Sequence, residues 1–277
     1  MHSGRMRQAR NDRLAFSTCP LSNVSLRLST CLQRFFVGIS VTLAFAGLGH
    51  SASLTIAAAS DLASAERDLT NSFQRTHRND SVRFVFAASG ALRQQIANGA
   101  PYDVFLSANA AYIDQLASNR KILPDTAVVY AHGQLAALWR DHKLHDINDL
   151  IQNWVRFVAL ANPKLAPYGL AAQQSLKHAG LWAKLRPKIV FGENVRQTLQ
   201  MFDSGNADVV LTAYSLMVKR PGVQAIPENW HQPILQKGGV VAASHEASLA
   251  REFLAFLQSP AGASVLRAHG LSPVVRH

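Results

Sequence analysis

The chain has 277 residues, of which 48% are hydrophobic and 16% are charged, so it can form one large or two ordinary globular domains. Its formal net charge of +11 would suit a nucleic-acid partner, but residues 1–53 hold six arginines and one aspartate and so carry +5 of it. The remaining +6 is scattered over 54–277 without a run of five or more Lys or Arg. Composition therefore argues against binding to nucleic acid.

Residues 1–53 have the pattern of an export signal. A basic region ends at Arg34, an apolar stretch follows at 35–49, and small residues close the segment at Ser51–Ser53. The apolar stretch is short for a membrane span, although an uncleaved anchor is the alternative. We expect a signal peptide that is cleaved near Ala52–Leu54, which would deliver the mature chain to a bacterial periplasm.

Both cysteines, Cys19 and Cys31, precede the apolar stretch. A lipid-anchored cysteine would follow that stretch, so neither fits a lipoprotein. The mature chain would contain no cysteine, which excludes disulfides, thiol catalysis and thiolate metal sites after cleavage.

After residue 53 the sequence alternates between short apolar strands and helices with apolar residues at helical spacing. The expected strands are Leu54–Ala59, Val82–Ala87, Val104–Ala108, one or two within Val128–Trp139, Arg156–Ala161, Lys188–Gly192, Val209–Ala213 and Val240–Ala243. The expected helices run from after Ser60-Asp61 to Phe73, then over Ala91–Asn98, Ala110–Ser118, Leu170–Ala179, Asn194–Phe202 and Ala247–Gln258, and from Pro260 to near Gly270. Repeated strand–helix units predict an α/β fold with helices on both faces of a parallel or mixed sheet.

Two such series, separated near residue 133, predict two lobes. We assign 54–132 together with 238–277 to lobe 1 and 133–237 to lobe 2, with chain crossings near Ala131–Leu135 and His231–Gly238. Open α/β sheets bind ligands at the carboxyl ends of their strands, and in two lobes those ends can face each other across a cleft. The cleft is therefore the expected binding site.

Four of the expected strand ends share one chemistry. Each closes a strand and opens a helix, so each leaves backbone N–H groups unpaired beside the positive end of a helix dipole. Taken singly these turns are ordinary helix caps, but converging neutral donors without Lys or Arg suit a small oxyanion. The four turns are Ser60-Asp61, Ser89-Gly90, Tyr168-Gly169 and Asn194-Val195.

Asp61 has two interpretations at this stage. In the first turn of a helix its carboxylate would complement the helix dipole. Alternatively, it could accept the proton of a guest such as the phosphate monoanion. The sequence favours the first role.

The blocks around these turns resemble a known family. AAASDL, SGALRQQIANGAPYDVFLSAN, PKLAPYG and GENVRQ are similar, in the same order, to the periplasmic molybdate-binding proteins of ABC transporters. The resemblance covers about Leu54 to Val274. It implies the type II periplasmic-binding fold, with two lobes, a mixed and mostly parallel sheet flanked by helices in each lobe, and a two-segment hinge.

The resemblance also implies a ligand set. Ser60 and Ser89 would give hydroxyl and amide donors, and Tyr168 and Val195 would give backbone N–H donors. Some family members add a tyrosine hydroxyl at the position of Ala213, a donor that this chain lacks, because Tyr214 comes one residue later and should point away from the cleft. The ligand would be molybdate and also tungstate, without a cofactor or a bare metal cation. The partner would be an ABC permease in the inner membrane, and the receptor a monomer.

Other functions stay open beside this one. A receptor of the same fold could bind sulfate, thiosulfate or iron(III), and a sensor could use the fold without transport. An exported enzyme acting on phosphate or sulfate esters would need a base beside Ser60 or Ser89, and no GxSxG motif is present. The eleven histidines contain no HExxH pair, and His142 and His145 lie in a polar loop. We therefore expect neither an enzyme nor a metal centre.

Overall fold

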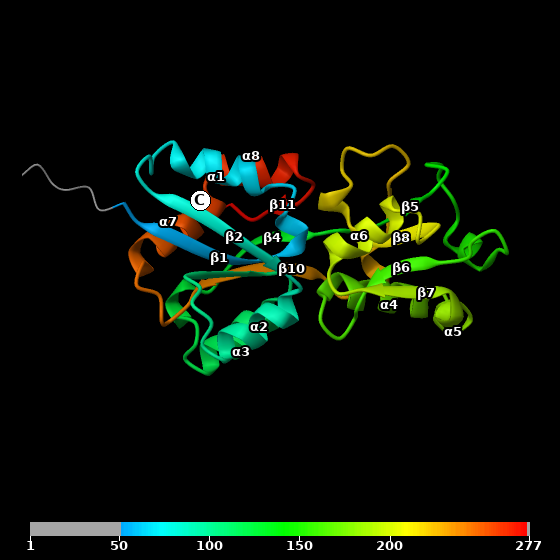
Figure 1. Ribbon diagram of the computed structural model, residues 1–277, viewed down its shortest axis with the longest axis horizontal. Helices are drawn as coiled ribbons and strands as arrows, with labels where there is room; N and C mark the ends of the chain where they lie inside the picture. Colours follow the sequence, from blue (N-terminus) through cyan, green and yellow to red (C-terminus); the bar gives the residue numbers. More distant parts are fainter. Residues whose placement is uncertain (1–50, 276–277) are drawn as a thin grey trace, which may run out of the picture. The chain divides into compact units, whose positions relative to one another are not determined.

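The computed structural model describes residues 51–275, which form two β-sheets flanked by helices (Figure 1). The signal peptide expected at 1–53, with Cys19 and Cys31, lies outside the described residues except for its last three positions. Among the helices within 51–275, none is both long and apolar enough to cross a membrane.

The first sheet of the described chain has six strands in the order β11-β4-β10-β3-β1-β2. β1 pairs in parallel with β2 and β3, whereas β10 runs antiparallel to β3 and β4, and β11 antiparallel to β4. Parallel pairing is thus confined to strands that a helical turn follows. The strands are β1 (Ser53–Ala59), β2 (Ser81–Ala87), β3 (Val104–Ser107), β4 (Val128–Gly133), β10 (Ile234–Val240) and β11 (Ser272–Pro273).

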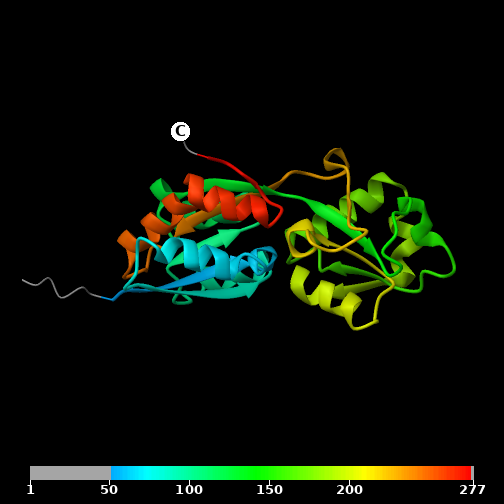
Figure 2. The ribbon, with the colours of Figure 1, turned by 90° about the horizontal axis from the view of Figure 1, so that it is seen from above.

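Helices cover both faces of this sheet, with α1, α7 and α8 on one face and α2 and α3 on the other (Figures 1 and 2). Successive side chains of a strand point to opposite faces. Ile56 of β1 therefore packs with Phe73 of α1 and Phe253 of α7, whereas the next residue, Ala57, packs with Leu92 of α2. The helices are α1 (Glu66–Gln74), α2 (Ser89–Ala97), α3 (Ala110–Ser118), α7 (Ala247–Gln258) and α8 (Pro260–Ala268).

The second sheet has five strands in the order β7-β6-β8-β5-β9 within the described range. β6 is parallel to β7 and β8, and β5 is antiparallel to β8 and β9. Ala137 of β5 packs with Leu176 of α4, and its neighbour Leu138 packs on the other face with Phe202 of α6. The elements are β5 (Leu135–Trp139), β6 (Val158–Ala161), β7 (Ile189–Gly192), β8 (Val209–Ala213), β9 (Gln224–Ala225), α4 (Pro167–His178), α5 (Trp182–Leu185) and α6 (Val195–Asp203).

Short 3₁₀ turns connect these elements. Two of them, η1 and η5, contribute to the site described below. The turns are η1 (Ser60–Leu62), η2 (Pro124–Thr126), η3 (Ile147–Ile151), η4 (Arg186–Lys188), η5 (Tyr214–Leu216) and η6 (Glu228–Trp230).

The chain crosses between the sheets twice in the described range. β4 ends at Gly133 and β5 begins at Leu135, so one residue separates the first sheet from the second. The return follows η6 and enters the first sheet at Ile234, the start of β10 (Figure 2). The exact limits of the lobes, 54–132 with 238–277 and 133–237, stay a prediction.

The strand expected at Val240–Ala243 is wrong, because β10 runs over Ile234–Val240. Its sequence, ILQKGGV, contains two polar residues and two glycines and therefore lacks the apolar pattern that predicts a strand. Packing explains the glycines, since a Cβ on Gly238 would lie 2.7 Å from the Leu254 side chain and one on Gly239 would lie 2.6 Å from that of Ile122.

Three expected helix starts also differ from the structure, and all of them bear on the site. The helix expected from Ala91 begins at Ser89, so this serine is the first residue of α2. The segment after β1 first makes the 3₁₀ turn η1 from Ser60, and α1 begins only at Glu66. The helix expected from Leu170 begins at Pro167, where the fixed φ of proline suits the first helical turn. Tyr168 therefore lies inside the first turn of α4 rather than before it.

Candidate functional site

The four residues that the sequence nominated line one cavity. Ser60, Ser89, Tyr168 and Val195 surround a space of about 190 Å³, its mouth included. Only about 10 Å³ of this space is open to the centre of a water-sized sphere, far below the several hundred Å³ of an ordinary small-molecule site, so the cavity leaves no room for an organic ligand. The cavity is completed by Ala59, Asp61, Ala87, Ala88, Ala108, Ala166, Pro167 and Asn194.

Sheet register brings the four turns together. β1 and β2 are parallel neighbours that end level, with Ala59 beside Ala87, so η1 and α2 start side by side. In the second sheet β6 and β7 are parallel neighbours with Ala161 beside Gly192, so α4 and α6 also start side by side. Each lobe therefore presents two helical starts at the carboxyl edge of its sheet, as open α/β sheets do for their ligands.

Ser89 presents a hydroxyl whose orientation is set by the backbone. Its Oγ accepts a hydrogen bond from the N–H of Ala108 at 3.1 Å, and the side chain does not cap α2. Because the oxygen is used as an acceptor, the hydroxyl hydrogen is left to donate. Ser89 is therefore placed as a donor to a guest in the cavity.

Ser60 presents a buried hydroxyl without a partner. Its side chain is almost fully buried, and its Oγ makes no hydrogen bond to any described residue. A buried polar atom left unpaired costs free energy, which a guest oxygen in the cavity would recover. Ser60 is thus a second hydroxyl that lines the cavity, and it has no hydrogen-bond partner among the described residues.

The second lobe offers backbone donors. Tyr168 follows Pro167 at the start of α4, where no side chain caps the helix and the proline has no N–H of its own. At the start of α6 the Asn194 side chain accepts from the N–H groups of Arg196 and Gln197, which leaves that of Val195 for a guest. Asn194 thus acts as the N-cap that its sequence position indicates.

Asp61 is the one charged residue among the residues that line the cavity. Its side chain is 1% exposed, and burial raises the pKa of its carboxyl to about 7. Oδ2 accepts hydrogen bonds from the Tyr168 hydroxyl at 3.0 Å and from Nε2 of Gln236 at 2.5 Å, while Oδ1 has no partner in the described residues. With no Lys, Arg or His in the lining, the cavity offers a guest only helix dipoles and neutral donors beside Asp61.

The sequence did not predict the buried hydrogen-bonded residues behind Asp61, which are Gln236 and Tyr130. Gln236 lies on β10, the strand that was misplaced, and its Oε1 accepts from the Tyr130 hydroxyl on β4 at 3.1 Å. No local pattern joins these residues, which are separated by 68 positions between Gln236 and Tyr168 and by 106 between Gln236 and Tyr130. The adjacency of Asp61 to Ser60 was the only available signal.

The two lobes touch directly around the cavity. The N–H of Gly90 donates to the Leu165 carbonyl at 2.9 Å, and a Cβ on Gly90 would lie 2.7 Å from that oxygen. On the other side the Ser215 hydroxyl of η5 donates to the Asp61 carbonyl at 2.8 Å, and that of Ser64 donates to the Ser215 carbonyl at 2.9 Å. These contacts restrict solvent access to the donors.

The whole described chain matches one family. Residues 54–272 match the family model of bacterial extracellular solute-binding proteins. The chain belongs to this family.

Several of its relatives are named as molybdate-binding proteins. ModA of Rhodobacter capsulatus is 31% identical over 194 residues, which is 69% of this chain and 77% of the relative. ModA of Azotobacter vinelandii is 28% identical over 252 residues, covering 88% and 98%. The solved structure of the Azotobacter vinelandii periplasmic molybdate-binding protein superposes with a TM-score of 0.74 at 29% identity, covering 81% of this chain and all of that one.

These relatives confirm the resemblance to periplasmic molybdate-binding proteins and the two-lobed α/β fold of this family member. A more distant structure, the sulfate-binding protein SubI of Mycobacterium tuberculosis, has a TM-score of 0.68 at 17% identity and covers 81% of this chain and 88% of its own. At that identity it supports the fold alone.

The tyrosine donor that the family resemblance led us to consider at position 213 is absent from this chain. Ala213 closes β8 and is fully buried, and Tyr214 begins η5. The Tyr214 ring lies against Gly270, where an added Cβ would come within 2.7 Å of it, and the residue does not line the cavity. Tyr214 lies outside the cavity lining as expected, but strand alternation is not the reason, because β8 ends at Ala213 and Tyr214 belongs to a 3₁₀ turn.

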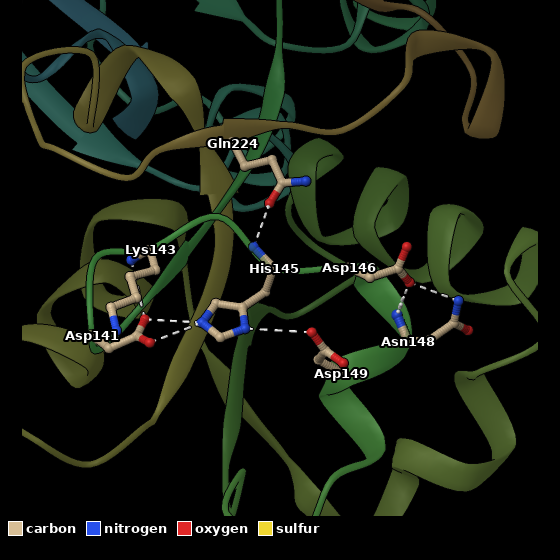
Figure 3. A network of polar contacts seen from close by, with 7 residues as sticks. All are labelled: Asp141, Lys143, His145, Asp146, Asn148, Asp149 and Gln224. Carbon is tan, nitrogen blue, oxygen red and sulfur yellow. Dashed lines mark hydrogen bonds and ion pairs between the residues drawn. The ribbon is translucent and has the colours of Figure 1, made fainter.

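No histidine among residues 51–275 lines the cavity. His145 is held between two carboxylates, with Nε2 2.9 Å from Asp141 Oδ2 and Nδ1 3.4 Å from Asp149 Oδ2 (Figure 3). Its ring also packs on Trp139 at 4.6 Å between centroids. Within residues 51–275 no group of three or more His, Cys, Asp or Glu side chains is arranged to hold a metal ion. The contacts of His145 fix the loop around it.

Proposed function

We propose that this chain is the extracytoplasmic receptor of an ABC importer and binds molybdate, and tungstate with it, in the cavity between the lobes. The observation that carries the proposal is the convergence of Ser60, Ser89, Tyr168 and Val195 on one small cavity lined without a basic side chain. The molybdate-binding relatives support the choice of guest.

Each donor has a distinct part in this proposal. The hydroxyls of Ser60 and Ser89 and the backbone N–H groups of Tyr168 and Val195 donate to the oxygens of the anion, so no protein atom contacts the metal. Hydrogen bonds to an ionised acceptor are shorter and stronger than neutral ones, and fixed donors need no reorganisation on binding. A tetrahedral dianion is thereby held without a countercharge.

Binding becomes transport through closure of the lobes. Contacts such as Gly90 to Leu165 form only when the lobes meet, and closure excludes water, which strengthens every donor–anion interaction. A permease in the inner membrane would recognise the closed shape, because a ligand that binds one conformation better shifts the population toward it. The receptor acts in the periplasm as a monomer and binds no nucleic acid.

No covalent step is needed in this function. Ser89 Oγ is bonded to a backbone N–H, and no histidine lines the cavity among the described residues. The carboxyl of Asp61 accepts from Tyr168 and Gln236 and is hydrogen-bonded to neither serine, so neither hydroxyl is paired with a base that would activate it. The chain is therefore proposed to be a binding protein without a cofactor, and not a hydrolase of phosphate or sulfate esters.

Calorimetric titration tests the proposal. The purified mature chain is titrated with molybdate, tungstate, sulfate and phosphate at one salt concentration. We expect one-to-one binding of molybdate and tungstate and no heat from sulfate or phosphate. Tight binding of sulfate would mean that the receptor has the proposed fold but a different ligand. No binding of any of the four anions would overturn the receptor function.

A further inference from the structure

We propose that Asp61 holds the bound anion as a neutral carboxylic acid, so that at alkaline pH the receptor takes up one proton with each anion. The inference rests on the proposed function, since it concerns the same cavity. It assigns Asp61 as an anion-binding residue that donates a hydrogen bond to the anion, a role that neither of the two interpretations of Asp61 from the sequence included.

The hydrogen-bond directions around Asp61 leave one place for a proton. The Tyr130 hydroxyl donates to Gln236 Oε1, so Nε2 of Gln236 is the donor to its other neighbours, Asp61 Oδ2 and the Tyr168 hydroxyl oxygen at 3.2 Å. Because the Tyr168 oxygen accepts from Gln236, its own hydrogen goes to Asp61 Oδ2. Both neighbours therefore donate to Oδ2, and a proton on the carboxyl must lie on Oδ1.

Oδ1 is also the oxygen that lacks a partner. It is buried and makes no hydrogen bond to a described residue, as is true of the adjacent Ser60 Oγ. Both residues line the cavity. An O–H on Oδ1 would donate to a guest oxygen beside the Ser60 hydroxyl, which satisfies both buried atoms with one anion.

The charge of the anion also favours a proton on Oδ1 of Asp61. A carboxylate beside an oxyanion dianion in a buried site places like charges together, and no basic side chain lines the cavity to offset them. A proton on Asp61 removes the repulsion and turns it into a hydrogen bond. One proton crosses from solvent to Oδ1, and no other bond changes.

The groups that face Asp61 cannot take over this proton. Tyr168 from α4 and Tyr130 from β4 are the titratable neighbours, and burial raises the pKa of both phenols well above 10, so both stay neutral. Gln236 and Ser215, from β10 and η5, carry no charge. The charged residues of α6, which packs on η1, include Arg196 and Asp203 in a neighbouring open groove outside the cavity lining.

The sign of the pH effect follows from these groups. Without anion the Asp61 pKa is about 7, and a bound dianion raises it further because like charge disfavours ionisation. Below that pKa the proton is already present and affinity is constant. Above it the proton must be taken up, so affinity falls by about tenfold per pH unit.

Titration calorimetry with molybdate, which stays a dianion through neutral and alkaline pH, measures the proton directly. Heats in two buffers of different ionisation enthalpy give the number of protons taken up at each pH. We expect close to one proton at pH about 8.5 and a Kd that weakens on the order of 100-fold between pH about 6 and about 9. Molybdate binding with no proton uptake and a flat pH profile would overturn the inference and leave the receptor function intact. No molybdate binding at any pH would overturn the receptor function instead.

Two variants sharpen the test. In Asp61→Asn the amide oxygen can accept from Tyr168 and Gln236 while the amide N–H donates to the anion, so we expect no proton uptake and tighter binding than wild type at pH about 9. Wild-type proton uptake in this variant would overturn the assignment. In Tyr168→Phe the backbone donor stays but a hydrogen bond that lowers the Asp61 pKa is lost, so the alkaline fall in affinity should move to higher pH. A shift to lower pH would contradict the proposal.

The matched control is Asp125→Asn, which removes an exposed carboxylate paired with Arg251 outside the cavity. It should keep the wild-type proton uptake, whereas loss of proton uptake in this control would contradict the assignment to Asp61. Circular dichroism of each variant checks the fold. If Asp61→Asn does not fold, Tyr168→Phe tests the proposal by itself.

Discussion

The two halves of the cavity use different chemistry. In the proposed site the first lobe offers side-chain groups, with the hydroxyls of Ser60 and Ser89 and the carboxyl of Asp61, in addition to the backbone N–H groups of the two serines, whereas the second lobe offers only the backbone N–H groups of Tyr168 and Val195. Side-chain donors can be changed by one substitution. Backbone donors are fixed by where a helix begins, so only a change in the path of the chain removes them. The two halves should therefore respond differently to mutation.

The largest effect should come from moving the backbone of the second lobe. In Gly169→Ala the new Cβ would lie 2.1 Å from the Ala161 carbonyl oxygen, so the first turn of α4 must shift away from β6. We expect a loss of roughly 2–4 kcal/mol in unfolding free energy, measured by urea denaturation. Molybdate affinity should fall by more than in any serine variant, and retention of both stability and affinity would show that the start of α4 is not a fixed donor.

The next effect should come from a side-chain donor of the first lobe. Ser89→Ala removes a charge-assisted donor and leaves the Ala108 N–H without its acceptor. We expect binding to weaken by roughly 1–3 kcal/mol in calorimetry, together with a small loss of stability. An unchanged affinity would remove Ser89 from the site.

Substitution of Ser60 should lower the affinity for the anion without lowering the stability of the protein. Its hydroxyl has no partner among the described residues, so Ser60→Ala should weaken anion binding by roughly 1–3 kcal/mol while leaving the unfolding free energy without anion equal or higher. Thermal melts with and without molybdate measure both quantities. A variant that loses stability but keeps its affinity would mean that the hydroxyl has a structural partner.

The smallest effect on binding should come from a side chain of the second lobe. Val195→Ala keeps the backbone N–H at the start of α6, so the Kd should change by less than about threefold although a buried side chain is shortened. A loss as large as that of Ser89→Ala would show that the valine side chain, and not its backbone, shapes the site.

Much of the fold and of the candidate site could be predicted from the sequence. Most strands and helices, the four turns and the N-cap of Asn194 follow from local patterns, because apolar periodicity and turn residues are local signals. Strand β10 could not be located from local patterns. Its Gln236, Gly238 and Gly239 contact residues that are distant in the sequence, and they do not form an apolar strand pattern. The burial of Asp61 likewise depends on Tyr168 and on the contact between lobes, which no local pattern contains.

The most direct test of the divided site is a crystal structure of the mature chain with molybdate, in which the anomalous signal locates the metal. We expect the anion in the cavity, with Oγ of Ser60 and Ser89 and the backbone nitrogens of Tyr168 and Val195 each about 2.7–3.2 Å from an oxygen of the anion. An anion bound instead beside Arg196 in the neighbouring groove, or held by a basic side chain anywhere else, would contradict the assignment of hydroxyls to one lobe and backbone amides to the other.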